Sequence, residues 1–222
     1  MRESIKKIEG PYQDSFSPNG IIGEKDACGV GFIANVEGIE SNWILKQSLK
    51  GLTCMEHRGG CGGDSDSGDG AGILCSIPWK YFEKKINLEN KKDFDRGLGM
   101  IFMPNNKEKI EECKSVCDKE AEKLGVKHTF WRTVPVNNEI LGPLAKANAP
   151  FINQWFLHIY KKDNLDIEKL LFQLRKRIEK KIRESFKNHV GDCEFYFASL
   201  SSQTVVYKGM VRSEILSEFY LD

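Results

Sequence analysis

Cys28 stands where a cysteine could act as a nucleophile. It follows an irregular stretch, residues 1–27, and opens the short apolar run CGVGFIANV, in which glycines at 29 and 31 leave the backbone open to close approach. The thiolate form of cysteine is a strong nucleophile, so the position leaves thiol catalysis open. By itself, a cysteine at the start of a strand is more often a core residue, and both interpretations stand at this point.

A glycine-dense loop, GGCGGDSDSGDGAG at residues 59–72, is the second unusual segment. The loop follows an expected helix and precedes an expected strand. A dinucleotide-binding loop has the reverse order, because its pyrophosphate binds at the N-terminus of the helix that follows. No lysine follows the loop, so it is not a P-loop either. A calcium loop starting at Asp64 would need glycine where Asp69 stands and glutamate where Cys75 stands. The loop is therefore interpreted as a tight backbone path packed close to an important site.

Cysteine and histidine side chains around this loop suggest zinc as an alternative. These residues are Cys54, His57, Cys61 and Cys75. Their spacing lacks the CxxC pairs of zinc knuckles, so a metal site is the less favoured interpretation. Cys113 and Cys117, four residues apart on an apolar helical face, are predicted to be small core residues.

The composition describes a globular chain without a strong charge of either sign. Among 222 residues, 33 basic and 32 acidic side chains leave a net charge of +1. A protein that binds nucleic acid or an anionic membrane surface normally carries a basic excess, so neither partner is expected. No apolar stretch reaches the roughly 18 residues of a membrane-spanning helix. Seven cysteines, an odd number in a long chain, favour a reducing intracellular compartment.

Hydrophobic periodicity predicts the helices that would position these residues. Ser41 is expected to cap a first helix whose apolar residues between 44 and 55 share one face. Asn106 is expected to cap a second helix, which Gly125 stops. A long charged helix is predicted over residues 166–186, and the last helix is predicted from Ser213, as its cap, through Leu221.

Strands are predicted between these helices. The predicted strands are residues 28–36, 71–77, 97–103, 128–134 and 151–160. The segments 194–200 and 204–209 flank the turn-like residues Ser201, Ser202 and Gln203, which predicts a terminal β-hairpin. Strands modestly outnumber helices, so a layered α/β or α+β fold is expected.

Three long motifs resemble the start of glutamate synthase. They are ACGVGFIANVEG at 27–38, GLTCMEHRGGCGGDSDSGDGAGIL at 51–74, and FYFASLSSQTVVYKGMV at 195–211, which runs into EFYLD at 218–222. IPWKYF, FMPN and LRKRIEKKI extend the similarity in the same order. The similarity is closest to the ferredoxin-dependent type and covers nearly the whole chain after the leader.

The resemblance implies a class II glutamine amidotransferase domain over residues 28–222, incomplete at its C-terminal end, behind a propeptide or leader at 1–27. Its fold would be α+β, part of the αββα four-layer sandwich of the N-terminal-nucleophile hydrolases. Its reaction would be the hydrolysis of L-glutamine to glutamate and ammonia. In the full enzyme, that ammonia would be passed to 2-oxoglutarate.

Cys28 aligns with the family's nucleophile, which becomes the first residue once the propeptide is removed. A thiol with a pKa near ~8.5 needs a base, and the freed α-amine of the same residue, with a pKa of about 7.7 to 8.0, supplies one. Arg58 matches a position beside the nucleophile in relatives, which implies a supporting role. The residues expected to let the chain approach the site are Gly59, Gly60, Gly70 and Gly72. Tyr207, Lys208 and Gly209 match the family's strand end and are treated as structural.

The chain departs from the family pattern at its end. The family's motifs for the glutamine carboxylate clamp and for the oxyanion hole are expected beyond Asp222, so no substrate-binding residue is assigned and the chain is interpreted as an N-terminal fragment. No cofactor or metal is expected in this chain. FMN, an iron–sulfur cluster, the remaining synthase domains and ferredoxin as electron donor are implied for the full-length enzyme, in the cytoplasm or the plastid stroma.

Two alternatives remain beside this interpretation. One is a non-catalytic intracellular interaction or zinc-binding module that keeps the Cys/Gly-rich scaffold. The other is a different class II amidotransferase, such as a phosphoribosylamine- or asparagine-forming enzyme, which would share the HRG segment but not the long C-terminal similarity.

Overall fold

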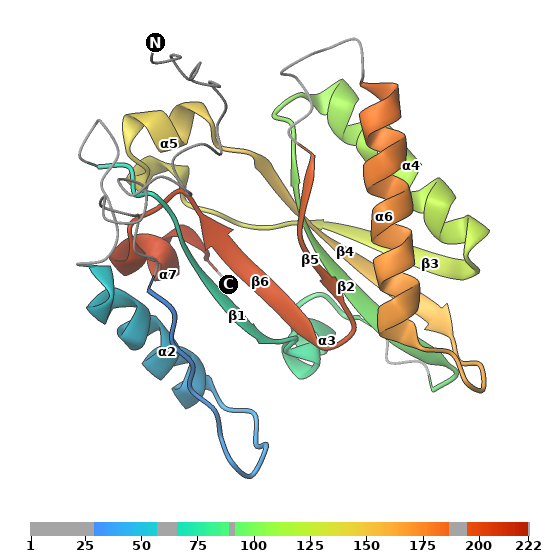
Figure 1. The fold of residues 1–222 in the computed structure, drawn as a ribbon, viewed down its shortest axis with the longest axis horizontal. Coiled ribbons are helices and arrows are strands. Elements are labelled where there is room, and N and C mark those ends of the chain that lie inside the picture. The colour runs from blue at the N-terminus through green and yellow to red at the C-terminus, as the bar shows by residue number, and fades with distance from the viewer. Residues whose placement is uncertain (1–28, 57–65, 89–91, 187–194, 222) are drawn as a thin grey trace, which may run out of the picture.

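Two antiparallel sheets face each other in the computed structural model, which describes residues 29–56, 66–88, 92–186 and 195–221 (Figure 1). The larger sheet has the strand order β3-β4-β2-β5, and the smaller one pairs β1 with β6. The strands are β1 (Ala71–Ser76), β2 (Phe94–Met103), β3 (Val126–Thr133), β4 (Phe151–Tyr160), β5 (Tyr196–Ser201) and β6 (Thr204–Gly209). The α+β class is confirmed.

Helices cover the outer sides of this pair of sheets. Two helices, α4 (Lys107–Lys123) and α6 (Ile167–Ser185), lie on the four-stranded sheet (Figure 1). Helix α2 (Asn42–Cys54) lies on the side of β1 and β6. The resulting order of layers is helix pair, larger sheet, smaller sheet, helix. No helix within the described ranges is long and apolar enough to cross a membrane.

Two hydrophobic cores hold the layers together. The first lies between the helix pair and the larger sheet and includes Trp155, Leu174 and the two cysteines Cys113 and Cys117, each 0% exposed. These cysteines were predicted to be core residues, and this is confirmed. The second core lies between the two sheets, around Phe156, and includes side chains of the short helices α3 (Trp79–Lys85) and α7 (Leu216–Phe219). Other short elements are α5 (Pro143–Ala147) and the 3-10 turns η3 (Asn138–Ile140) and η4 (Ser213–Ile215).

The predicted starts of three helices are confirmed by their capping contacts. The side chains of Ser41, Asn106 and Asp166 accept hydrogen bonds from the backbone N–H groups three residues ahead, at 3.4, 3.0 and 3.0 Å. Gly125 follows α4 with a φ of +82°, a left-handed conformation that glycine adopts without strain. Ser213 was predicted to cap the last helix, but Arg212 precedes η4 and no side chain caps it.

The predicted terminal hairpin is wrong. β5 and β6 do not pair with each other: β5 pairs with β2, and β6 pairs with β1 in the other sheet. Between them the chain turns a corner, where Ser201 Oγ accepts from the backbone N–H groups of Gln203 and Thr204 at 3.0 and 3.2 Å. The short connection that suggested a hairpin therefore links a strand of the larger sheet to a strand of the smaller sheet.

The predicted strand at 28–36 is also wrong within residues 29–36, which carry no strand pairing. The chain there ends in a turn in which Gly38 N donates to Asn35 O at 3.1 Å, and Phe32 is 95% exposed. The apolar run has the residues of a buried strand, but among the described residues there is no sheet edge beside it. A strand forms only beside a neighbouring strand, and the described residues provide none for 29–36.

Candidate active site

The two predicted catalytic residues, Cys28 and Arg58, lie outside the described residues. The same holds for His57, Gly59, Gly60, Cys61 and Asp64. Three described segments flank these positions. They are residues 29–31, the end of α2 at Met55 and Glu56, and the end of the glycine-dense loop at 66–72.

The flanks of Cys28 and Arg58 meet. A β-carbon placed on Gly31, three residues after Cys28, would lie 3.9 Å from Met55 Cε, and Met55 stands three residues before Arg58. Met55 ends α2, where its backbone N–H donates to Leu52 O at 3.0 Å. The end of α2 therefore lies beside residue 31.

The described end of the glycine-dense loop is a tight backbone path, as predicted. A β-carbon on Gly68 would lie 2.5 Å from the backbone carbon of Val211, and one on Gly142 would lie 2.5 Å from the backbone nitrogen of Ser67. Ser67, 3% exposed, accepts a hydrogen bond from Ala145 N at 3.0 Å and so caps α5 from a distant part of the chain. The described end of the loop is packed between the end of β6 and α5.

Gly70 and Gly72 were expected to permit close approach, and the structure gives each a reason. Gly70 has a φ of +134°, which side chains other than glycine rarely adopt. Gly72 pairs with Lys208 across the β1–β6 ladder, and a β-carbon on it would lie 2.7 Å from Lys208 Cβ. The start of β1 and the end of β6 therefore approach more closely than two ordinary residues would allow.

A buried polar chain that sequence reasoning missed joins the two sheets. Gln154, in the middle of β4 and 0% exposed, accepts from Arg132 Nη1 at 2.7 Å and donates from Nε2 to the Tyr207 hydroxyl at 3.1 Å. A glutamine inside the apolar run FINQWFLHIY was the available signal. Tyr207 and Lys208 were treated as structural, and these contacts agree with that role.

Tyr220 closes this end of the smaller sheet. Its hydroxyl donates to Lys208 O at 2.8 Å, and its ring meets that of Tyr207 edge to face with centroids 5.0 Å apart. Burial raises the pKa of Tyr220 well above its ordinary value. This phenol therefore stays protonated and anchors the backbone.

Lys208 reaches into a mostly apolar cavity of about 220 Å³ beside the end of β6. Its ammonium group donates to the Tyr196 hydroxyl and lies 4.4 Å from the centroid of that ring. Phe102, Met210 and Phe219 line the apolar walls. This cation is thus engaged by an aromatic side chain.

The described cysteines outside the core do not form a metal shell. Within residues 29–56, 66–88, 92–186 and 195–221, no group of three or more His, Cys, Asp or Glu side chains could hold a metal ion. The Cys54 side chain is exposed and that of Cys75 is half-buried, and burial raises the pKa of Cys75. This shift of Cys75 is opposite in direction to the lowered pKa of an activated thiol.

The sequence matches one protein family over almost its whole length. The profile described as glutamine amidotransferases class-II covers residues 28–222, so the match starts at Cys28.

Relatives of this chain among curated proteins are named glutamate synthases. The chloroplastic ferredoxin-dependent glutamate synthase of Oryza sativa subsp. japonica is 45% identical over 225 residues, which cover 100% of this chain and 14% of that protein. Ferredoxin-dependent glutamate synthase 2 of Synechocystis sp. is 44% identical over 210 residues, covering 91% of this chain and 13% of that protein. The NADPH glutamate synthase large chain of Bacillus subtilis is 39% identical over 224 residues, covering 98% and 14%. The chain thus spans about one seventh of these relatives.

Proposed function

This chain belongs to the class II glutamine amidotransferases, and from that membership we propose that it is the glutaminase part of a glutamate synthase, with Cys28 as the nucleophile. The observation that carries the proposal is the start of the family match at Cys28, behind 27 residues that the match leaves out. Residues 1–27 are then a propeptide and 28–222 belong to the amidotransferase domain.

The proposed reaction needs one residue for two roles. The α-amine of Cys28, freed by propeptide removal, takes the thiol proton directly or through a water molecule, and the thiolate attacks the side-chain amide carbon of L-glutamine. The C–N bond breaks, the proton passes to the leaving nitrogen as ammonia, and a thioester remains. Water, deprotonated by the same amine, then attacks the thioester and releases glutamate and the thiol.

Arg58 is proposed to support this site without taking part in the bond changes. Its guanidinium offers five donors in a fixed fork, which suits the ordering of backbone carbonyl groups near a thiolate. The approach of Gly31 to Met55 supports the proposal, because these residues lie three positions from Cys28 and Arg58. The close-packed glycines at 68, 70 and 72 fix the described end of the glycine-dense loop.

The finer fold assignment, an N-terminal-nucleophile αββα sandwich, is part of the same proposal. The described layers support it, since two sheets stack between the α4–α6 pair and α2 (Figure 1).

The proposal for the whole protein extends beyond this chain. Its relatives are named glutamate synthases, and most of their length lies outside the matched region. We therefore propose that the released ammonia is passed to 2-oxoglutarate on domains that hold FMN and an iron–sulfur cluster, with ferredoxin as the electron donor, in the cytoplasm or the plastid stroma. Cys113 and Cys117 are buried in the core, and within the described residues Cys54 and Cys75 join no group of three or more potential metal ligands.

Substitution of the cysteines tests the proposal. Cys28→Ala in the complete synthase should lower glutamine hydrolysis by at least about 10³-fold, because the nucleophile is lost. Cys54→Ala and Cys75→Ala are matched controls and should keep the rate. A Cys28→Ala enzyme that still hydrolyses glutamine at a near-normal rate would refute Cys28 as the nucleophile.

A further inference from the structure

The cavity beside the end of β6 has the properties of a small-molecule site. Its volume is about 220 Å³, and its mostly apolar walls include Phe102, Ile152 and Phe219. Ligand sites in proteins are concave and mostly apolar, with a few polar groups that fix the orientation of the ligand. Drug-sized ligands occupy sites of roughly 300–1,000 Å³, so this cavity suits a smaller molecule.

The side chain of Lys208 supplies a positive charge at this cavity. Its backbone has another task, because it pairs with Gly72 in the β1–β6 ladder and its carbonyl accepts from the Tyr220 hydroxyl at 2.8 Å. The ammonium group donates to the Tyr196 hydroxyl and lies 4.4 Å from the centroid of that ring. Within the described ranges, no carboxylate pairs with it. Lys208 therefore brings a charge that these residues do not neutralise to an apolar cavity.

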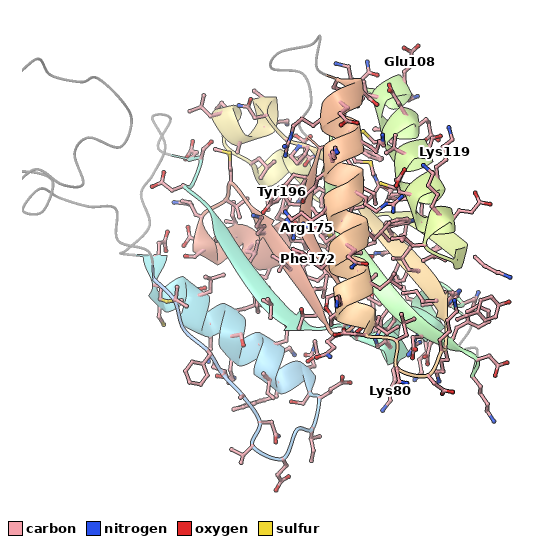
Figure 2. All side chains as sticks on the ribbon, turned by 45° about the vertical axis from the view of Figure 1, so that its right-hand side comes forward. Lys80, Glu108, Lys119, Phe172, Arg175 and Tyr196 are labelled. Atoms are coloured by element: carbon pink, nitrogen blue, oxygen red, sulfur yellow. The ribbon has the colours of Figure 1, made fainter. Side chains whose placement is uncertain are left out.

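Tyr196 places a second polar group beside this cation. It lies on β5, an edge strand of the larger sheet that contacts α6 (Figure 2). Its ring meets that of Phe102 edge to face, with centroids 5.9 Å apart. The hydroxyl oxygen accepts from Lys208, which leaves the hydroxyl proton for donation to a ligand. Lys208 and Tyr196 together thus offer one donor to each oxygen of a carboxylate.

We propose that this cavity binds a small monocarboxylate with an apolar body. The Lys208 ammonium and the Tyr196 hydroxyl bind the carboxylate, and the apolar walls cover the hydrocarbon part of the ligand. The single charge of the ligand matches the single charge of Lys208. A phosphate or a dicarboxylate brings a second negative charge, and the described lining residues include no second cation to neutralise it.

The cavity lies next to the glycine-dense loop, yet its described lining contains no residue of that loop. The lining also contains none of the described residues that flank Cys28 and Arg58. Val211 forms part of the cavity wall, and its backbone carbon is the atom that a β-carbon on Gly68 would approach to 2.5 Å. The ligand is not expected to be glutamine, whose α-amine and side-chain amide would lie against apolar walls without partners.

Isothermal titration calorimetry of the complete synthase with benzoate as the probe tests this proposal without any measurement of activity. Benzoate should bind with a Kd below about 1 mM. Benzyl alcohol has the same ring and no charge, and it should bind at least about 10-fold more weakly.

Two substitutions separate the polar groups. Lys208→Met removes the charge and keeps an apolar side chain, so it should weaken benzoate binding at least about 10-fold. Binding of benzyl alcohol to the same variant should be unchanged, which reports that the cavity is intact. Tyr196→Phe keeps the ring and should weaken benzoate binding about 5-fold.

Lys127→Met is the matched control. The Lys127 ammonium also lies over an aromatic ring, 4.9 Å from the centroid of Tyr160, but Lys127 does not line the cavity. This variant should bind benzoate as the unmodified protein does.

Three outcomes would overturn the proposal. No binding of benzoate at about 10 mM would show that the cavity takes no such ligand. Unchanged benzoate binding by Lys208→Met would place the carboxylate elsewhere. Displacement of benzoate by L-glutamine would assign the probe to the glutaminase site. The proposal does not depend on the proposed function, since calorimetry measures binding whether or not Cys28 is the nucleophile.

Discussion

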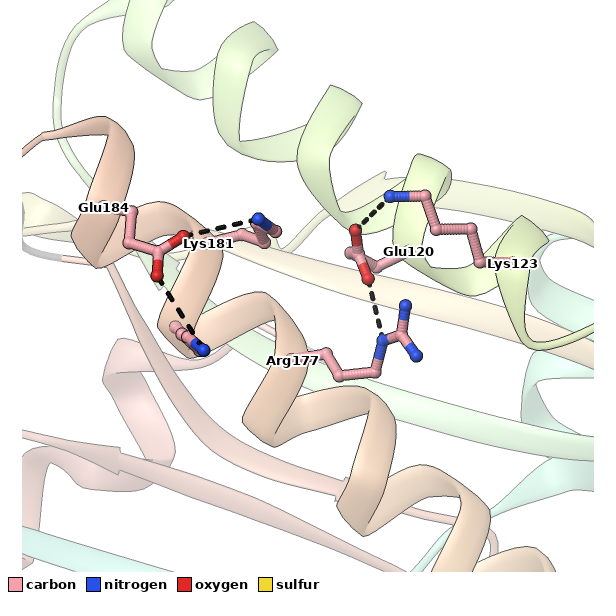
Figure 3. Close-up of polar contacts among 6 residues, drawn as sticks. Glu120, Lys123, Arg177, Lys181 and Glu184 are labelled. Atoms are coloured by element: carbon pink, nitrogen blue, oxygen red, sulfur yellow. Dashed lines mark hydrogen bonds and ion pairs between the residues drawn. The ribbon is translucent and has the colours of Figure 1, made fainter.

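Glu120 links helix α4 to helix α6 through an ion pair. Its side chain is 4% exposed, accepts from Lys123 Nζ within α4 at 2.6 Å, and accepts from Arg177 Nε of α6 at 2.8 Å (Figure 3). Glu120→Gln should destabilise the fold by about 1–2 kcal/mol, because both ion pairs of this buried carboxylate are lost. The loss is limited to this range because both cations are half-exposed and can be solvated by water. Glu184→Gln, which loses pairs within α6 only, should cost less than about 0.5 kcal/mol in a denaturant titration.

The same carboxylate should make stability depend on pH. The hydrogen bond from Lys123, opposed by burial and aided by Arg177, lowers the pKa of Glu120 in the folded state. A pKa lower in the folded than in the unfolded chain gives stability that is fully present above the unfolded value of about 4.3 and is lost as pH falls through the folded value. The drop in unfolding free energy between pH 6 and pH 3 should be smaller in Glu120→Gln, and an equal drop would contradict this assignment.

Gly68 is predicted to be irreplaceable for steric reasons. Gly68→Ala places a β-carbon 2.5 Å from the backbone of both Val211 and Arg212, so backbone has to move, at a cost of about 1–3 kcal/mol. Gly51→Ala is the matched control, since Gly51 lies inside α2 with nothing within 4 Å of the added atom. It should stabilise by about 0.5–1 kcal/mol in the same thermal unfolding measurement.

The residue scale also shows what sequence patterns reveal. The helical spacing of Cys113 and Cys117 was enough to predict burial, because a helix repeats its core face every three to four residues. Gln154 was not found, because its partners Arg132 and Tyr207 come from other strands, and strand pairing is not visible in a local pattern. Cys28 and Arg58 were identified from motif resemblance, and their roles stay predictions.

At the scale of elements, the corner between β5 and β6 decides the topology. Glu168, in the first turn of α6, accepts from Ser202 N at 2.7 Å and from the Ser201 and Ser202 hydroxyls at 3.1 and 2.7 Å. Glu168→Ala should destabilise by about 1–2 kcal/mol, because this exposed corner loses charge-assisted hydrogen bonds. Glu168→Gln keeps an acceptor oxygen and should lose less, and equal losses in urea unfolding would show that the corner does not depend on these bonds.

Element predictions succeeded where the signal was local and failed where it was not. Caps such as Asn106 and strands such as β4 follow from neighbouring residues, and both were found. The hairpin failed because the pairing of β6 with β1 joins segments about 130 residues apart. The strand at 28–36 failed because a strand needs a partner, and an apolar pattern alone does not supply one.

At the scale of the whole molecule, the 222-residue chain should be inactive on its own. The family's carboxylate clamp and oxyanion donors are expected beyond Asp222, and one oxyanion donor is worth roughly 2.7 to 4 kcal/mol in rate. The exposed apolar side chains of Val30, Phe32 and Val36 should also make the chain poorly soluble or partly molten. Glutamine hydrolysis by residues 1–222 should therefore not exceed background, and an enzyme-like rate would place the clamp and oxyanion hole inside this segment.

The most direct test of the central claim is mass spectrometry of the complete synthase after reaction with a glutamine-mimicking electrophile. We predict that the labelled protein begins at Cys28, with residues 1–27 removed, and that the label is on the Cys28 sulfur. Cys28→Ala should abolish labelling, while Cys54→Ala and Cys61→Ala should keep it. An active, labelled enzyme that still begins at Met1, or a label that persists after Cys28→Ala, would contradict an N-terminal cysteine nucleophile.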